Sequence, residues 1–240
     1  FVVVHWNAAD QTRSYSSSIP APLIPHLNDR YAGIKHATRF KAGGRRLFSY
    51  NGNSAYEDKG GFADPELFDI FTFKAVLNDP KAALKDMNTI VLSDSMAKRY
   101  FGHENPIGKT IQLENKYDFM VGAVVEDIPD NSSVRFEYLV KFENFGRFDN
   151  VEMDNWGRHE NYLGFVILDP NVDPDNFSEK IAGALASIDP ESTLKFHLFP
   201  YKNVRLMGFN NDGTLKFVLV FAAIGILILL VISVVIGIRQ

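Results

Sequence analysis

The chain has 240 residues, of which 25 are Lys or Arg and 29 are Asp or Glu, giving a formal net charge of −4. Its basic residues are scattered along the sequence, which argues against nucleic acid as a partner because phosphate binding requires a basic face. There is no Cys, so disulfides, thiolate metal sites and cysteine nucleophiles are excluded. The length allows one large domain or two small ones with their own cores.

The apolar start, Phe1 to Val4 followed by His5 and Trp6, has two interpretations. It predicts either a first strand or the interfacial end of an earlier membrane helix, with Trp6 at headgroup depth. The second interpretation would make residues 7–214 a loop between two membrane helices. The chain begins without Met and without the pattern of a signal peptide, so we expect that an upstream segment has been removed.

The first helix is predicted over Ala21–Arg30, where three prolines crowd its start and Leu23 and Leu27 lie on its inner face. Alternation then predicts a strand over Ile34–Phe40. Two consecutive glycines, Gly43-Gly44, end that strand.

A hairpin is predicted next, because Arg45–Tyr50 and Ala55–Asp58 flank the turn signal Asn51-Gly52-Asn53. Asp64-Pro65 is a good N-cap and first-turn pair, and it predicts a short helix. The inward-facing residues of that helix are Leu67, Phe68 and Phe71.

The middle of the chain is its most patterned part, and it begins with a strand over Thr89–Leu92. Ser93 is predicted to cap the following helix. The apolar side of that helix is Ala97, Tyr100 and Phe101, and Gly102 is placed to end it.

A turn at Pro106-Ile107-Gly108-Lys109 then predicts a strand over Thr110–Leu113, and a tight turn at Asn115 leads to a longer strand. On that longer strand Tyr117, Phe119, Val121 and Ala123 are expected to share one face. The polar turn Asp127–Ser132 closes the unit.

After Phe145 the chain is polar and irregular as far as Tyr162, and a strand, helix, strand unit follows. Its elements are Gly164–Leu168, a helix opened by Asp173-Pro174, and Leu194–Phe199. These elements predict an α+β fold. In this architecture residues 1–44 and 159–214 form a membrane-proximal porter-like βαβ module. Residues 45–158 form an inserted β-rich outer module, and residues 200–216 lead directly into a membrane helix.

The membrane helix is predicted over residues 215–238, because Phe217–Ile238 carries no charge and is almost wholly Leu, Ile, Val, Phe and Ala. At a helical rise this stretch spans about 33 Å, enough for a bilayer core. Lys216 and Arg239 flank it as interfacial charges would. The other interpretation is a buried core helix, but such a helix seldom stays apolar around its whole circumference for this length.

Several short motifs occur in order along the chain, and together they resemble FtsX-like, MacB-type ABC transporter permeases. They are Gly61-Phe62-Ala63-Asp64-Pro65, Phe68-Asp69-Ile70-Phe71, Thr89-Ile90-Val91-Leu92-Ser93, Ala97-Lys98-Arg99-Tyr100-Phe101-Gly102, Asn105-Pro106-Ile107-Gly108-Lys109, Val121-Gly122-Ala123-Val124 and Pro129-Asp130-Asn131-Ser132. The motif residues that we expect to serve the structure are Asp64, Pro65, Ala97, Phe101, Gly102, Pro106, Gly108, Lys109, Gly122, Pro129 and Ser132.

The resemblance implies a domain in the periplasm, residues 7–214, between the first and second helices in the bacterial inner membrane. It implies a permease that pairs with a second copy as a dimer and works with a cytoplasmic ABC ATPase subunit. In that family the domain binds no nucleotide. Against such permeases the chain lacks the first membrane helix, the last two and the cytoplasmic loop that contacts the ATPase.

The sequence itself predicts no enzyme, no cofactor and no metal site. Its nearest imitation of a phosphate loop, Gly102 to Thr110, has one residue too many between its glycines and leads into a strand. No Gly-x-Ser-x-Gly elbow occurs. No His-x-x-x-His pair occurs either, and His159-Glu160 lacks the second His of a zinc helix.

A cluster of aromatic residues has two interpretations. It either lines an apolar groove for a hydrophobic substrate or a periplasmic adaptor protein, or packs the outer module. Its members are Phe136, Phe142, Phe145 and Phe148.

The function that these observations predict is an extracytoplasmic domain of a permease subunit, which transmits ATP-driven motion of the membrane helices and binds a substrate or a partner protein. The alternative is the extracytoplasmic domain of a membrane-bound sensor. A third hypothesis, an anchored envelope hydrolase, is disfavoured by the missing catalytic motifs. Charge leaves the topology open, because the basic residues before the helix outnumber Arg239 after it. The substrate, if there is one, and the identity of the ATPase stay open.

Overall fold

The computed structural model describes residues 1–10, 14–157, 161–210 and 213–238. The strands are β1 (Val2–Asn7), β2 (Ile34–Ala42), β3 (Arg46–Tyr50), β4 (Asn53–Glu57), β5 (Gly60–Ala63), β6 (Ala75–Leu77), β7 (Thr89–Ser93), β8 (Thr110–Leu113), β9 (Tyr117–Val125), β10 (Tyr138–Lys141), β11 (Leu163–Leu168) and β12 (Leu194–Phe199). The helices are α1 (Leu23–Arg30), α2 (Leu67–Ile70), α3 (Pro80–Ala83), α4 (Asp94–Phe101), α5 (Asn144–Asp149), α6 (Pro174–Ile181), α7 (Tyr201–Met207) and α8 (Thr214–Ile238), with a 3-10 turn at Ala184–Ser187.

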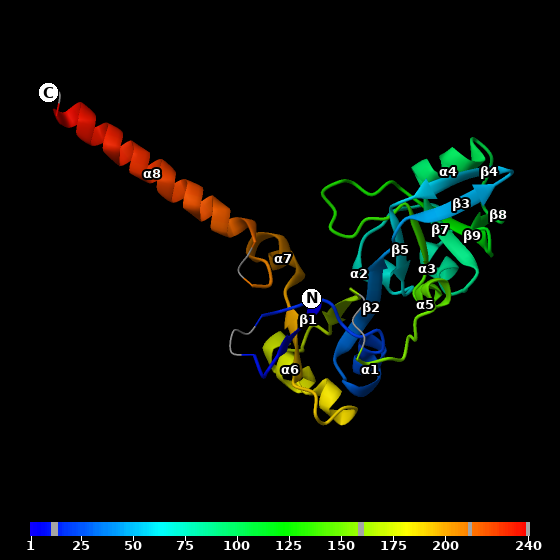
Figure 1. The fold of residues 1–240 in the computed structure, drawn as a ribbon, viewed down its shortest axis with the longest axis horizontal. Coiled ribbons are helices and arrows are strands. Elements are labelled where there is room, and N and C mark those ends of the chain that lie inside the picture. Colours follow the sequence, from blue (N-terminus) through cyan, green and yellow to red (C-terminus); the bar gives the residue numbers. More distant parts are fainter. Residues whose placement is uncertain (11–13, 158–160, 211–212, 239–240) are drawn as a thin grey trace.

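These strands form one mixed sheet in the order β12-β1-β11-β2-β5-β10-β7-β9-β8-β3-β4, with β6 beside β9. The few helices lie on its two faces, and α8 projects far from the globular part (Figure 1). The predicted α+β fold is therefore confirmed.

The first residues form β1, which lies between β12 and β11. These strands and β2 are the membrane-proximal strands of the sheet, on the side of α7 and α8 (Figure 1). β1 pairs antiparallel with β12 along its whole length, from Val2 opposite Phe199 to Asn7 opposite Leu194. Val2, Val3 and Val4 are buried. Of the two interpretations of this segment the strand is confirmed, and the interfacial end of a membrane helix with Trp6 at headgroup depth is wrong.

Strand β2 joins the two halves of the sheet. It pairs with β11 from Leu163 opposite Phe40 onwards, while Phe40–Ala42 also pairs with Ala63–Gly61 of β5. The sheet is therefore continuous from the membrane-proximal strands to the outer ones (Figure 1). The division into residues 1–44 with 159–214 and residues 45–158 stays a prediction.

The outer part of the sheet contains the predicted hairpin. β3 and β4 pair from Arg46 opposite Glu57 to Tyr50 opposite Asn53. The turn is two residues long, and Asn51 and Gly52 both have positive φ, which is the backbone that this kind of tight hairpin requires. Asn53 is thus the first residue of β4 and not part of the turn.

A bulge interrupts the long strand β9. Ile90 of β7 lies opposite Val121, but the next residue, Val91, lies opposite Ala123, so Gly122 is the extra residue. Because of this shift Ala123 packs on the other face of the sheet from Val121. The prediction that Ala123 shares a face with Tyr117, Phe119 and Val121 is wrong for that reason.

Two of the longer helices begin with the caps that the sequence predicts. Ser93 Oγ accepts a hydrogen bond from Met96 N at the start of α4, and Asp173 Oδ1 accepts one from Asn176 N at the start of α6. α1 begins at Leu23, two residues later than predicted. Three helices, α3, α5 and α7, were not predicted, and residues 200–216 lead into the membrane helix through α7.

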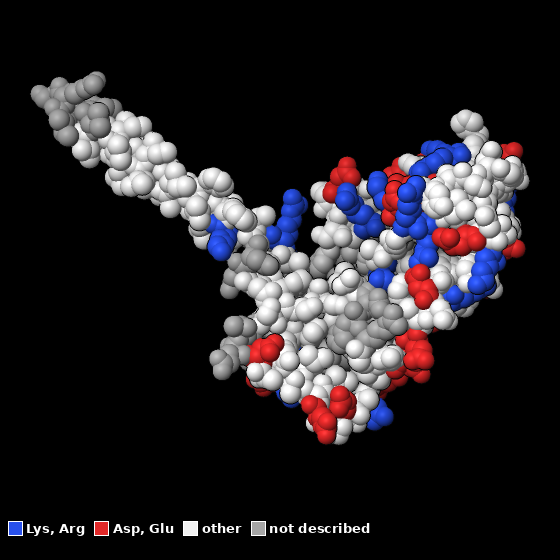
Figure 2. Space-filling model, viewed as in Figure 1, with Lys and Arg blue, Asp and Glu red and all other residues white. Residues whose placement is uncertain are grey.

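The last helix, α8, is the one element of the described chain that is long and apolar enough to span a membrane, over Thr214–Val234. None of that window is buried against the globular part. On the face that Figure 2 shows, the part of α8 drawn in white beyond its base carries no Lys, Arg, Asp or Glu. Lys216 lies exposed in the first turn of this helix. Arg239, the other predicted flank, lies outside the described residues.

Candidate functional site

The membrane helix is joined to the globular domain through a docked segment. Tyr201, at the start of α7, packs edge-on against Phe71 and Phe165 at ring-centroid distances of 5.5 and 5.4 Å, and those two rings lie 5.0 Å apart. Phe165 belongs to β11 of the sheet, and Phe71 directly follows α2. α7 is thereby held on one face of the sheet by aromatic packing.

The turn between α7 and α8 is held by hydrogen bonds. The side chain of Asn210 accepts from Tyr15 N at 2.6 Å and donates to Tyr15 O at 3.0 Å. Gly213 N donates to Met207 O at 2.9 Å, and Thr214 Oγ1 donates to Arg205 O at 3.1 Å. A Cβ on Gly213 would lie only 2.4 Å from backbone atoms at the end of α7, so the close approach requires glycine. The first turn of α8 is therefore tied to the fold.

A second constellation lies where the inner and outer parts of the sheet meet, and it centres on Arg39 of β2. Its guanidinium donates to both carboxylate oxygens of Asp64, at 2.9 and 2.6 Å, and to Glu143 Oε1 at 2.6 Å. It also donates to Ala21 O at 3.3 Å and stacks 4.0 Å from the ring centroid of Phe142. One buried side chain thus connects the start of α1, β2, the segment after β5 and the start of α5.

The charge of Arg39 is kept in spite of its burial. Burial opposes the charged form, but the hydrogen bonds and charges of Asp64 and Glu143 outweigh it and raise the pKa of Arg39 above its ordinary value. The Asp64 carboxylate is occupied by this pairing and does not cap α2, whose N-cap residue is Glu66 without a side-chain bond. The predicted capping role of Asp64 is therefore wrong.

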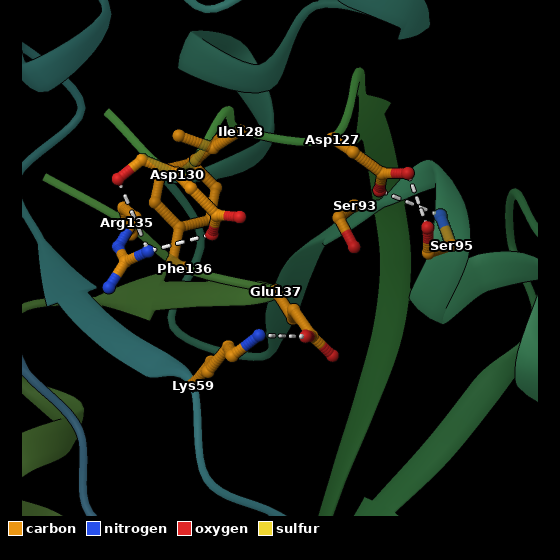
Figure 3. Close-up of a pocket in the computed structure, with 9 residues that line it drawn as sticks. All are labelled: Lys59, Ser93, Ser95, Asp127, Ile128, Asp130, Arg135, Phe136 and Glu137. Carbon is orange, nitrogen blue, oxygen red and sulfur yellow. Dashed lines mark hydrogen bonds and ion pairs between the residues drawn. The ribbon is translucent and has the colours of Figure 1, made fainter. Parts of the chain in front are cut away.

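A polar cavity of about 200 Å³ opens at the ends of the parallel strands β7 and β9. Figure 3 shows its lining and the pairs that its charged groups form. Lys59 pairs with Glu137 at 3.3 Å, and Arg135 pairs with Asp130 at 2.8 Å. The charges of this cavity therefore largely satisfy one another.

The remaining carboxylate of the cavity, Asp127, supports helix α4. It accepts hydrogen bonds from Ser95 N at 2.9 Å and from Ser95 Oγ. Burial would raise the pKa of Asp127, but these bonds outweigh it and lower the pKa below its ordinary value of 3.8. Ser95 contacts this carboxylate with no histidine between them, so it lacks the base that activates a serine nucleophile. Among the described residues, no group of three or more His, Asp or Glu side chains is arranged to hold a metal ion.

Changing Asp127 to Ala should cost about 1 kcal/mol of the free energy of unfolding at neutral pH, as loss of a helix-capping group does. The pKa of Asp127 is lower in the folded protein than in the unfolded chain. Its contribution to stability is therefore present above pH 3.8 and is lost as the pH falls below that value. Urea denaturation at several pH values measures the difference between the variant and the wild type. A difference that grows on acidification would contradict the assignment.

The four aromatic residues predicted to line a groove or to pack the domain are buried or half-buried. Phe142 and Phe145 each contact Tyr162 within one core cluster, at 5.4 and 5.6 Å, while Phe136 lies on the other face of the sheet against Phe73 at 5.1 Å. Phe148 is half-buried against Tyr117 at 4.7 Å. They do not form a continuous exposed surface, and a binding role for them stays a prediction.

Most motif residues lie in turns, caps and the core. Gly102 and Gly108 have positive φ, Ala97 and Phe101 are buried on the inner side of α4, and Gly122 is the bulge. Turn hydrogen bonds join Lys109 N to Pro106 O and Ser132 N to Pro129 O, at 3.0 Å in both turns. Pro65 O accepts from Phe68 N at the start of α2.

Sequence reasoning missed Arg39 and Asn210. A charged residue at the buried end of a predicted strand was the available signal for Arg39. For the segment that holds Asn210, the signals were Pro200 before α7 and Gly208 after it, which are the usual boundaries of a helix.

The fold and the docked connection define the class of protein: a globular α+β domain carried on a membrane-spanning helix. The chain belongs to the MacB-like periplasmic core domain family, whose model matches residues 1–184. It is the periplasmic domain of an ABC transporter permease of that family, in the inner membrane with its globular part in the periplasm. Membership implies a membrane-embedded transporter with an ATPase partner, and favours the permease hypothesis over the sensor.

Solved structures share the fold at low sequence identity. A domain of a putative permease protein from Porphyromonas gingivalis has a TM-score of 0.69 and 22% identity, over 83% of this chain and 89% of that one. The periplasmic region of MacB from Actinobacillus actinomycetemcomitans has a TM-score of 0.56 and 16% identity, over 81% and 87%. The extracellular domain of the noncanonic ABC-type transporter YknZ from Gram-positive bacteria has a TM-score of 0.56 and 12% identity, over 83% and 100%. No curated protein matches the sequence significantly.

Proposed function

We propose that this periplasmic domain transmits ATP-driven motion of the membrane helices to the periplasm, for export or for work on the cell envelope. In this proposal it binds a substrate or a partner protein there and performs no catalysis of its own. The permease acts as a dimer, and a separate cytoplasmic ABC ATPase subunit hydrolyses ATP.

The observation that carries this proposal is the docked connection between the sheet and α8. Tyr201 packs on Phe71 and Phe165, and Asn210 binds Tyr15, so a displacement of the first turn of α8 must pull on the membrane-proximal strands. A flexible tether would carry no such force, because a free loop absorbs displacement by changing its own dihedral angles.

The continuity of the sheet extends the same argument to the outer part. β2 is hydrogen-bonded to β11 on the membrane-proximal side and to β5 on the outer side, and Arg39 links it to Asp64 and Glu143. Motion delivered at β12 and β11 therefore reaches the outer strands through backbone hydrogen bonds and one buried ion cluster. Packed cores transmit strain because their compressibility is low.

A flexible Gly-Ser linker inserted after Gly213 in the full-length protein should uncouple ATP hydrolysis from transport. It separates α8 from α7 and leaves the globular domain intact. The same linker inserted after Gly52, in the tight turn between β3 and β4, is the matched control and should leave coupling unchanged. ATPase activity and transport are measured together in proteoliposomes, and undiminished transport with the Gly213 insertion would contradict the proposal.

A further inference from the structure

A cavity lies at the level where the globular domain meets the membrane. It has a volume of about 420 Å³ and lies between the end of α7 and the first turns of α8. Its lining residues are Met207, Asn210, Leu215, Lys216 and Leu219. Asn210 is fixed by its two hydrogen bonds to Tyr15, so one wall of the cavity is held in place.

The cavity combines an apolar wall with a cation. Leu219 lies inside the membrane-spanning window and is 60% exposed, and Met207, at the end of α7, is 39% exposed. Leu206, next to Met207, is 47% exposed. Large apolar side chains this exposed, directly beside a membrane helix, are placed for contact with lipid.

The two helices that form the cavity, α7 and α8, carry exposed basic residues. Lys202 and Arg205 of α7 and Lys216 of α8 are exposed, and within the described part of the chain none of them forms an ion pair. In Figure 2 basic side chains mark the base of α8. From Tyr201 to Phe217 the sequence holds one acidic residue, Asp212, which lies outside the described residues. An excess of cations beside a membrane helix attracts anionic headgroups.

We propose that this cavity binds an anionic phospholipid of the periplasmic leaflet. The Lys216 ammonium contacts the lipid phosphate, and Met207 and Leu219 contact the glycerol region and the start of an acyl chain. The ligand is a lipid and not a free phosphate, because the cavity is continuous with the lipid-facing surface of α8. This proposal does not depend on the transmission of motion.

Lipid contact is tested by a nitroxide label at Met207→Cys in the full-length protein, in nanodiscs that contain phosphatidylglycerol. The chain has no Cys of its own, so the label is unique within it. We expect the label to collide with oxygen, which partitions into lipid, and to be shielded from a water-soluble nickel chelate. Ile188→Cys is the control, because Ile188 is exposed at 42% and directly follows the 3-10 turn after α6, a helix that lies away from α8 (Figure 1).

Two outcomes of the label experiment would overturn the proposal. A Met207 label as accessible to the nickel chelate as the Ile188 label would place the cavity in water. A label shielded from both reagents would mean that another segment of the full-length protein fills it.

Lipid selectivity is tested by mass spectrometry of the protein released from nanodiscs made of equal amounts of phosphatidylglycerol and phosphatidylcholine. We expect phosphatidylglycerol to be retained preferentially, and Lys216→Gln to reduce its retention about fivefold. Lys180→Gln, an exposed lysine of α6, should leave retention unchanged. Equal retention of the two lipids, or displacement of phosphatidylglycerol by inorganic phosphate, would refute the lipid site.

Discussion

Replacing Arg39 by Met should lower the free energy of unfolding by about 3–5 kcal/mol, because the change leaves the buried Asp64 carboxylate without its counter-charge. Arg39 and Asp64 have side chains that are 8% and 14% exposed, and two guanidinium hydrogen bonds join them. A loss of this size is a large fraction of the about 5–15 kcal/mol by which folded proteins are usually stable. Urea denaturation followed by the fluorescence of the two tryptophans measures it.

The two carboxylates should not contribute equally. Glu143 is 40% exposed and accepts one hydrogen bond from Arg39, so water screens its charge, and Glu143→Gln should cost less than about 1 kcal/mol. Asp64→Asn should cost several times more, since it removes the negative charge and replaces one of the two oxygens that accept from the guanidinium and from Arg39 N by an amide NH2 group. Equal losses in the two variants would show that burial does not set the strength of this cluster.

Adding a single methyl group at Gly60 should destabilise the fold by about 1–3 kcal/mol, as overpacking of a full core does. Gly60 of β5 lies opposite Tyr138 of β10, and a Cβ at Gly60 would lie 2.0 Å from Tyr138 Cζ. Tyr138 is fully buried, and its ring packs 4.6 Å from that of Phe48, so it has little room to move. The melting temperature and the urea midpoint of Gly60→Ala measure the effect.

A matched glycine and a second-site change make this test specific. Gly183→Ala is the control, because nothing lies within 4 Å of a Cβ built there. Tyr138→Leu removes the clashing atoms, so Gly60→Ala should cost much less in that background. A cost that stays the same in both backgrounds would mean that the strain lies in the backbone of β5 and not in the contact with Tyr138.

Elements that depend on neighbouring residues could be predicted from the sequence. The caps at Ser93 and Asp173 satisfy amide groups three residues away, and the tight turn at Asn51-Gly52 sets the register of its own hairpin. Such patterns are complete within a few positions. The equally local cap of α3, Asp79-Pro80, was missed. The membrane helix was found because its apolar run is continuous.

Other features that were missed depend on partners far along the chain. α7 is a short helix without a side-chain cap, and it is held by Tyr201 against Phe71 and Phe165. In α5, Phe145 and Phe148 are three residues apart, which is a helical spacing. The residues around them are polar, so the sequence showed no clear apolar face there. Arg39 meets partners 25 and 104 positions away, which no local pattern encodes.

The pairing of β1 with β12 sets the order in which the polypeptide can fold as it is made. Val2 finds its partner only at Phe199, so β1 must wait for most of the domain to be synthesised and moved across the membrane. Its other neighbour, Phe165 of β11, also comes late. The apolar segment of α8 leaves the ribosome immediately after β12. The pairing of β1 with β12 and the insertion of α8 into the bilayer are therefore nearly simultaneous. A delay in export would leave Val2, Val3 and Val4 uncovered, as an open strand edge that invites aggregation.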